Sequence, residues 1–217
     1  GWTYDRKYDA YQRKVPKGKD GPIKLWQLKT FPFDATRRTS SALILVLYAD
    51  GKCRLWKTIK GSPDCISIIV DPTHEQWYNA QMRKLGGKGL RTIAMAATDV
   101  TSANDTFTTS LFPGGLPDIT TASDEEFQEM IISAREKAGS LHRIDFEGFD
   151  NDWTAKSHPS FELVGFACFD AAVRPSTRRV VQELKAAQVN VIMLTGDGVD
   201  AAISVADTAG LFSNTDS

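Results

Sequence analysis

A threonine, a glycine and an aspartate stand together near the end of the sequence, at Thr195-Gly196-Asp197. They follow the apolar run 191–194 and precede a stretch with helical spacing. In an open parallel sheet, ligands gather beyond the carboxyl ends of the strands. The Thr195 hydroxyl and nearby N–H groups could therefore hold a phosphoryl oxygen, whose negative charge the helix dipole favours. The same tripeptide also serves as a plain strand-to-helix turn, so both interpretations stay open.

Three side chains in the first half of the chain have types suited to a nucleotide. Lys60 directly follows an apolar strand pattern and can meet a triphosphate or an adenine edge as a point charge. The Phe33 ring can stack on a purine, and Arg91 can clamp a phosphate. Each also has an ordinary explanation: a solvated lysine before a turn, a core aromatic and an exposed strand residue.

The first part of the chain is expected to fold as an antiparallel sheet. Strand patterns cover residues 23–28, 42–48 and 53–59, and the last two flank Asp50-Gly51, a strong hairpin signal. The stretch before them, residues 5–24, is rich in Lys, Gly and Pro and is expected to be an exposed loop.

Further elements alternate along the next hundred residues. A helix is expected over 75–85, ended by Gly86-Gly87 because glycine tolerates left-handed backbone angles, and a strand over 90–97. Residues 98–123 have the composition of a flexible insertion. A capping-box pattern at Ser123 predicts a helix to about residue 138. Residues 145–159 resemble a loop.

The remaining residues follow a strand–helix–strand–helix order. Apolar strands are expected over 163–169 and 191–194, with a helix after each. The second of these helices is expected over about 199–209, ended by Gly210. Pro175 is expected in the first turn of one helix, where its missing N–H costs nothing. This order predicts a parallel α/β sheet and a domain boundary near residue 160. The expected fold class is therefore α/β (α+β), with an antiparallel domain followed by a parallel one. The helix that begins near Pro175 is expected to have an apolar face made of Val180, Val181, Leu184 and Ala187.

Composition limits the possible partners. The formal net charge of -1 gives no field that would favour nucleic acid or an anionic membrane surface. The longest apolar run, 42–49, is too short to cross a bilayer, which needs about 20 residues. Three widely spaced cysteines favour reduced thiols over a disulfide framework and match no metal-ligand pattern.

Five segments, taken in order, resemble the P-type ATPases from the middle of the nucleotide-binding domain into the phosphorylation domain. They are Phe33–Arg38, Lys60–Asp64, Gly89–Arg91, Arg174 and Thr195–Asp197. The resemblance covers nearly the whole chain apart from residues 98–123 and 139–160. It implies an N-terminally truncated nucleotide-binding domain over 1–160 and part of a haloacid-dehalogenase-like phosphorylation domain over 161–217.

The resemblance also implies residue roles. In that family an aromatic ring stacks on adenine, a lysine lines the same pocket and an arginine reaches the phosphates; these roles pass, in that order, to Phe33, Lys60 and Arg91. The threonine of the phosphorylation domain contacts the phosphoryl group, so Thr195 and Asp197 are the expected catalytic residues. The full set of residues expected to bind ATP is Phe33, Arg38, Lys60, Gly61, Arg91 and Arg174.

The branch of the family is indicated by residues 169–174. Most P-type ATPases carry Asp-Pro-Pro-Arg there, whereas this chain has Phe-Asp-Ala-Ala-Val-Arg, which is similar to a drifted form of the type V, endoplasmic-reticulum pattern. That branch is implicated in removing mis-inserted transmembrane helices. The lysosomal branch, linked to polyamine export, is the alternative. The implied location is a cytosolic domain of a membrane protein, in the endoplasmic reticulum.

Two positions depart from the family pattern. Gly198 stands where an asparagine is usual, and Arg37–Ser40 replaces a Lys-Arg-Met sequence. The first change makes the segment partly similar to the family's Mg²⁺ motif, so a magnesium role for Asp197 or Asp200 is a lesser alternative. No residue is assigned as a metal ligand, and Mg²⁺ is expected only with ATP in the parent protein.

The sequence contains no Asp-Lys-Thr-Gly-Thr, whose aspartate forms the phosphoenzyme in this family. The parent is therefore expected to be an ATP-hydrolysing transporter, while this chain is expected to bind ATP without turning it over. Its expected partners are the nucleotide and the actuator and transmembrane domains, with no nucleic acid and no direct membrane contact. Two other classes remain: a haloacid-dehalogenase-like phosphatase, and an interaction module that has lost the nucleotide.

Overall fold

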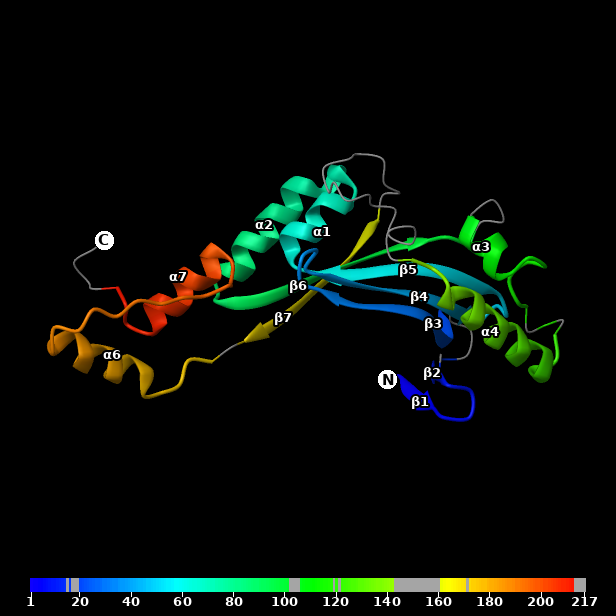
Figure 1. Cartoon of the computed structure of the whole chain (residues 1–217), viewed down its shortest axis with the longest axis horizontal. Coiled ribbons are helices and arrows are strands. Elements are labelled where there is room, and N and C mark those ends of the chain that lie inside the picture. The colour runs from blue at the N-terminus through cyan, green and yellow to red at the C-terminus, as the bar shows by residue number, and fades with distance from the viewer. Residues whose placement is uncertain are drawn as a thin grey trace. The chain divides into compact units, whose positions relative to one another are not determined.

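The computed structural model of the chain describes residues 1–14, 16, 20–101, 106–118, 120, 122–142, 161–170 and 172–212. Seven strands form one sheet in chain order (Figure 1). The strands are β1 (Thr3–Asp5), β2 (Ala10–Gln12), β3 (Pro22–Asp34), β4 (Thr39–Tyr48), β5 (Cys53–Gly61), β6 (Leu90–Asp99) and β7 (Glu162–Asp170). The pairs from β1–β2 to β4–β5 are antiparallel.

The helices are interspersed with the later strands. They are α1 (Pro63–Ile69), α2 (Glu75–Gly86), α3 (Thr106–Leu111), α4 (Asp124–Gly139), α6 (Thr177–Ala186) and α7 (Val199–Thr208), and a short 3₁₀ turn, η1 (Pro72–His74), precedes α2. The architecture is therefore α+β, with an antiparallel sheet as expected for the first part of the chain. In the described part of the chain, no helix combines the length and apolarity needed to span a bilayer.

The β4–β5 hairpin forms as its sequence predicts. The Tyr48 amide donates to the Lys52 carbonyl at 2.9 Å, and Gly51 has a φ of 84°, which glycine adopts without strain. Inward side chains of β3, β4 and β5 alternate with more exposed ones, since successive strand residues face opposite sides. The hairpin thus supplies one apolar face for a core.

Helix α4 covers that apolar face. Phe127, Ile131, Ala134 and Ala138 recur at helical spacing and are all buried, and the Phe127 ring lies 5.1 Å from the Trp26 ring of β3. The predicted capping box is present, because the Glu126 amide donates to Ser123 Oγ at 3.3 Å and the Ser123 amide donates to Glu126 Oε2 at 2.8 Å.

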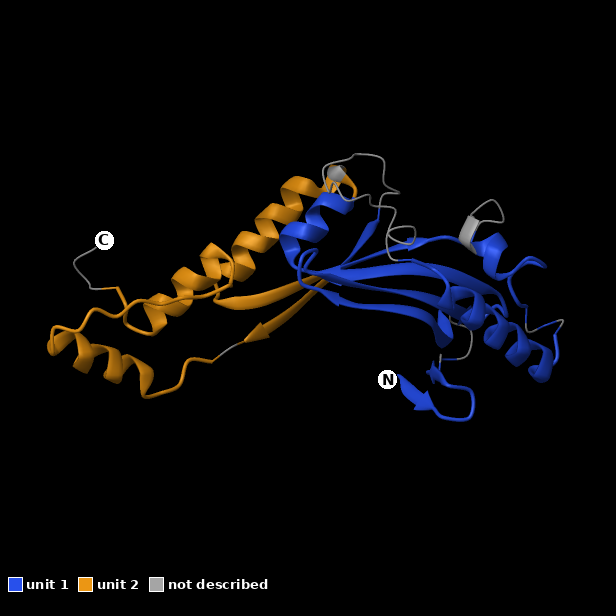
Figure 2. Cartoon of the chain, viewed as in Figure 1, with its two compact units in different colours: residues 1–70, 95–164 blue, residues 71–94, 165–217 orange. Residues whose placement is uncertain are grey.

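The chain divides into two compact units, residues 1–70 with 95–164 and residues 71–94 with 165–217 (Figure 2). The limits of the units fall within β6 and β7 and at the end of α1. The second unit contains α2 and α7, which pack against each other. Its Tyr78 ring lies edge-on to Phe166, with 5.2 Å between ring centroids. The division into domains at residue 160 stays a prediction.

Two expectations about the first unit are wrong, and one helix was not predicted. The stretch 5–24 is not only loop, because it contains β2 and the start of β3, and Ala10 is buried in the core. The supposed insertion 98–123 contains α3 and places Leu111 and Phe112 in the core. Helix α1 follows the Lys60 segment without having been expected. These elements are short, so few residues carry a periodic signal.

The second unit differs from expectation in three places. Residues 191–194 form no strand, and Ile192 and Leu194 are 81% and 94% exposed. Pro175 precedes α6 in a turn in which the Thr177 amide donates to the Arg174 carbonyl, so it is not within the first helical turn. Of the apolar face expected on α6, only Val181 is buried.

The end of α2 also differs. Gly87 keeps a right-handed φ of -61°, and the left-handed glycine is Gly89, with a φ of 71°. By contrast, α7 ends before Gly210 (φ 77°) as expected. The loop predicted over 145–159 lies outside the described residues.

Candidate functional site

The ends of β3 and β5 bring two predicted site residues to the same end of the sheet. Both strands pair with the beginning of β4: Asp34 of β3 lies opposite Thr39, and Lys60 of β5 lies opposite Ser40. Phe33 immediately precedes Asp34. Strand pairing therefore places Phe33 and Lys60 on the strands that flank β4, although 27 positions separate them in the printed sequence.

Both side chains are available to a ligand. Phe33 is 65% exposed, which is unusual for an aromatic ring and excludes the core role considered for it. Lys60 is also exposed, and among the described residues its ammonium has no hydrogen-bond or ion-pair partner. A flat apolar ring and an uncommitted cation at one sheet end can serve a planar, anionic ligand.

The turn between β3 and β4 fixes Arg38. The Asp34 carboxylate accepts hydrogen bonds from the Thr36 amide at 2.8 Å and the Arg37 amide at 3.0 Å, as aspartates do in tight turns. Arg38 then adopts a φ of 52°, a left-handed conformation that disfavours residues with a Cβ. Its carbonyl accepts the Ser62 amide at 3.0 Å, which joins this turn to the segment after β5.

Gly61 has a packing role beside this turn. A Cβ added there would lie 2.4 Å from the Arg38 carbonyl oxygen and 2.7 Å from Thr39 Cγ2. The glycine is therefore required by the close approach of two backbones, whereas its predicted contact with a nucleotide stays a prediction.

Arg38 itself is paired with Asp64, in the first turn of α1. The guanidinium Nη2 donates to the Asp64 carboxylate, and the two side chains are 53% and 61% exposed. The neighbouring carboxylate raises the pKa of Arg38. Sequence reasoning gave Asp64 no role, because two opposite charges 26 positions apart carry no local pattern.

The second unit brings Arg91 and Asp197 together. Arg91 Nε lies 3.0 Å from Asp197 Oδ1, and its Nη2 donates to Oδ2 at 3.1 Å, so the guanidinium engages both carboxylate oxygens. The Asp197 amide donates to Thr195 Oγ1 at 3.0 Å. The Thr195–Asp197 segment thus forms a local turn before α7, whose N-cap residue is Gly198.

Arg174 takes no part in the contacts between Arg91 and the Thr195–Asp197 segment. In the described part of the chain its side chain is exposed and makes no hydrogen bond or ion pair. Within the described ranges, no three His, Cys, Asp or Glu side chains are grouped as metal ligands. A role for Asp197 or Asp200 toward Mg²⁺ therefore has no geometric support here.

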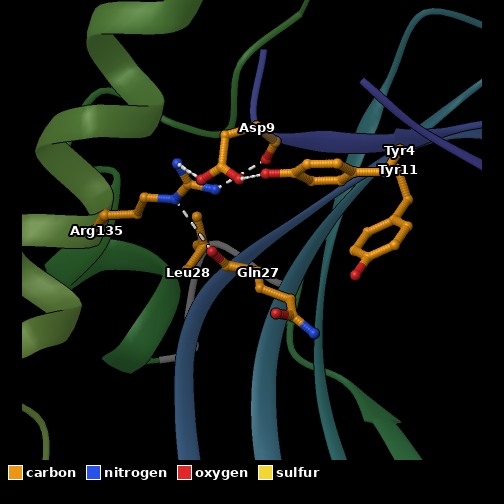
Figure 3. Close-up of a pocket in the computed structure, with 6 residues that line it drawn as sticks. All are labelled: Tyr4, Asp9, Tyr11, Gln27, Leu28 and Arg135. Carbon is orange, nitrogen blue, oxygen red and sulfur yellow. Dashed lines mark hydrogen bonds and ion pairs between the residues drawn. The ribbon is translucent and has the colours of Figure 1, made fainter. Parts of the chain in front are cut away.

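A separate pocket of about 400 Å³ lies beside β1 and β2 in the first unit (Figure 3). Its charged groups satisfy one another: Arg135 Nη1 lies 2.8 Å from Asp9 Oδ2, Arg135 Nε donates to the Gln27 carbonyl at 3.0 Å, and Tyr4 donates to Asp9. No sequence signal indicated this cluster. Its ion pair ties α4 to the β1–β2 hairpin, and its lining offers no cation without a partner comparable to Lys60, so it is the weaker candidate site. The residues that line it are Tyr4, Asp9, Tyr11, Gln27, Leu28 and Arg135.

Comparison with protein-family models and with curated proteins identified no related protein. No protein-family model matches the chain, and no curated protein matches its sequence. The functional conclusion therefore rests on the sequence motifs and on the geometry at the sheet end and at the Arg91–Asp197 pair.

Proposed function

We propose that this chain is an ATP-binding part of a type V P-type ATPase. The observation that carries the proposal is that Phe33 and Lys60 lie at the same end of the β3–β4–β5 sheet, on the two strands that flank β4. The two residues were selected from sequence as an adenine platform and a pocket lysine. Their position at the same end of the sheet and the exposure of both side chains support a common pocket.

The residues at this sheet end fit the nucleotide chemically. The Phe33 ring offers a face to a purine, while the Lys60 ammonium and the Arg38 guanidinium complement phosphate oxygens. Gly61 lets the Arg38 turn lie against the end of β5. A stacked purine with a few polar contacts corresponds to a dissociation constant from about 100 μM to 1 mM, or roughly 4 to 6 kcal/mol.

For the second unit, we propose that Thr195 and Asp197 serve the phosphoryl group in the parent enzyme and that Arg91 and Arg174 contact phosphates. The Arg91–Asp197 pair supports one site formed by the Gly89–Arg91 and Thr195–Asp197 segments, because it joins side chains that are 106 positions apart in the sequence. A haloacid-dehalogenase-like fold for residues 161–217 is part of this proposal. Among the described residues no three His, Cys, Asp or Glu side chains are grouped as metal ligands, and Mg²⁺ belongs to the proposal only as the companion of ATP in the parent protein.

The wider context belongs to the same proposal. The parent would couple ATP hydrolysis to transport at the endoplasmic reticulum membrane, and this chain would act with the actuator and transmembrane domains. Because the sequence lacks the phosphorylated aspartate, its own contribution is nucleotide binding and orientation without turnover. The lysosomal branch is the alternative within the same family.

ATP titration followed by amide chemical shifts tests the proposal. Shifts are expected around Phe33 and Lys60, with weaker binding in Phe33→Ala and in Lys60→Gln. Phe33→Leu keeps apolar bulk but removes the ring, so it should also weaken binding if stacking matters. Lys52→Gln, at the other end of the β4–β5 hairpin, is the matched control and should bind as the wild type does. Absence of any shift at this sheet end would refute ATP binding and favour an interaction module.

A further inference from the structure

The pairing of Arg38 with Asp64 places an anion inside the proposed nucleotide site. Arg38 lies one residue before Thr39, which is opposite Gly61, and Lys60 is opposite Ser40. Arg38 therefore lies in the turn just before β4, two residues before the position opposite Lys60, and Asp64 follows four residues after Lys60. Any phosphate that approaches Arg38 meets a guanidinium that already has a carboxylate partner.

The backbone around this pair is restrained on both sides. The Asp34 turn holds Arg38 in its left-handed conformation, and the Ser62 amide bonds the Arg38 carbonyl at 3.0 Å. Asp64 is held in the first turn of α1, where the Ser67 hydroxyl donates to its carbonyl at 2.8 Å. The ends of the two side chains are the parts that can exchange partners, because more than half of each is exposed.

An exposed carboxylate is a replaceable partner for a guanidinium. Ion pairs with this exposure contribute about 0 to 1 kcal/mol, because water screens the charges and ordering two side chains costs entropy. A terminal phosphate group carries more charge than a carboxylate and, like a carboxylate, can offer two oxygens to the guanidinium fork. An incoming triphosphate can therefore displace Asp64 at small cost.

On this basis, and resting on the proposed nucleotide function, we propose that Asp64 is a built-in competitor that lowers the affinity for nucleotide phosphates by occupying Arg38. Without the Asp64 charge, the Arg38 guanidinium would have no carboxylate partner and would be available to a phosphate. The effect concerns phosphates alone, because an uncharged nucleoside has no group that competes for Arg38. Asp64 thereby determines how strongly the site distinguishes ATP from adenosine.

The experiment compares ATP and adenosine on the wild-type chain and on Asp64→Asn by calorimetry or amide shifts. ATP is expected to bind about two- to fivefold more tightly to Asp64→Asn, in line with loss of an exposed ion pair, while adenosine binding stays unchanged. Arg38→Gln should weaken ATP binding, and adding Asp64→Asn to it should give no further gain. Asp50→Asn makes the same chemical change at the opposite end of the hairpin and should alter neither ligand.

The outcomes separate this inference from the function on which it rests. If wild-type protein binds ATP and Asp64→Asn binds it equally well, the competitor role is refuted and nucleotide binding stands. If neither protein binds ATP or adenosine, the proposed function fails. An equal gain for adenosine would show that Asp64 acts through the fold, which also overturns the competitor role. Asp64→Glu retains the charge and should leave ATP affinity near that of the wild type.

Discussion

Arg91, at the beginning of β6, and Asp197, in the turn before α7, form a bidentate ion pair. The guanidinium reaches Oδ1 at 3.0 Å and Oδ2 at 3.1 Å. A planar guanidinium matches a carboxylate in this geometry, which a lysine cannot reproduce. The pair therefore orients the Asp197 side chain, and it joins two segments of the second unit that are 106 positions apart.

A double-mutant cycle should detect this pair. Arg91→Gln and Asp197→Asn are each expected to lower the free energy of unfolding, and the double variant should lose about 0.5 to 1 kcal/mol less than their sum. Arg91→Lys should recover only part of the coupling, because it offers a single charge without the planar fork. Urea unfolding measures these values. Strictly additive losses would show that the contact contributes nothing to stability.

Replacing Gly61 should lower stability more than breaking the Arg91–Asp197 pair does. Gly61→Ala would put a methyl group 2.4 Å from the Arg38 carbonyl oxygen, so the β4 and β5 ends must move apart. A cost of roughly 1 to 3 kcal/mol is expected, as for other overpacked sites. Gly114→Ala is the control, since nothing lies within 4 Å of the added Cβ. Chemical denaturation of both variants provides the comparison, and equal stability would contradict the packing role of Gly61.

Elements with strong local signals were predictable from the sequence. The Asp50-Gly51 turn, the capping box at Ser123 and the glycine after α7 each act through a few neighbouring residues, and all three appear where expected. The strands of the central hairpin were predictable for the same reason. Their alternating side chains leave one face to be buried, which fixes their register.

Long-range relationships were not predictable. Residues 191–194 have an apolar strand pattern, yet a strand forms only with a hydrogen-bonded neighbour, and none pairs with them in the described chain. The contacts of Arg38 with Asp64 and of Arg91 with Asp197 depend on how distant segments pack, which no spacing rule gives. Sequence motifs therefore selected candidate residues, whereas the charged partners of those residues required the fold.

The three cysteines should differ in reactivity. Burial raises the pKa of Cys53 to about 12, so almost no reactive thiolate is present at pH 8. Cys65 is buried as well, whereas Cys168 is exposed. Iodoacetamide should therefore label Cys168 first, as followed by peptide mass spectrometry, and all three should react at similar rates in guanidinium chloride. Early labelling of Cys53 in the native protein would contradict its buried position.

The Asp9 cluster should make stability depend on acid pH. The hydrogen bond from Tyr4, followed by the Arg135 charge, lowers the pKa of Asp9 in the folded state. A carboxyl with a lowered folded pKa contributes stability above its unfolded value, near 3.9, and that contribution is lost as the pH falls through the folded value. Because the Asp9 side chain is 59% exposed, solvent screening keeps the effect below about 1 kcal/mol.

Urea unfolding between about pH 2 and pH 6 measures this contribution. Asp9→Asn should show a shallower loss of stability with acid than the wild type, because the asparagine has no proton to gain in that range. Tyr4→Phe removes the leading cause of the lowered pKa and should flatten the profile in the same direction. Asp50→Asn provides the control, since among the described residues Asp50 takes part in no ion pair. Parallel acid profiles for Asp9→Asn and the wild type would mean that the Asp9 carboxylate does not stabilise the hairpin, and α4 would then be held by its apolar contacts and by the hydrogen bonds of Arg135 to backbone carbonyls.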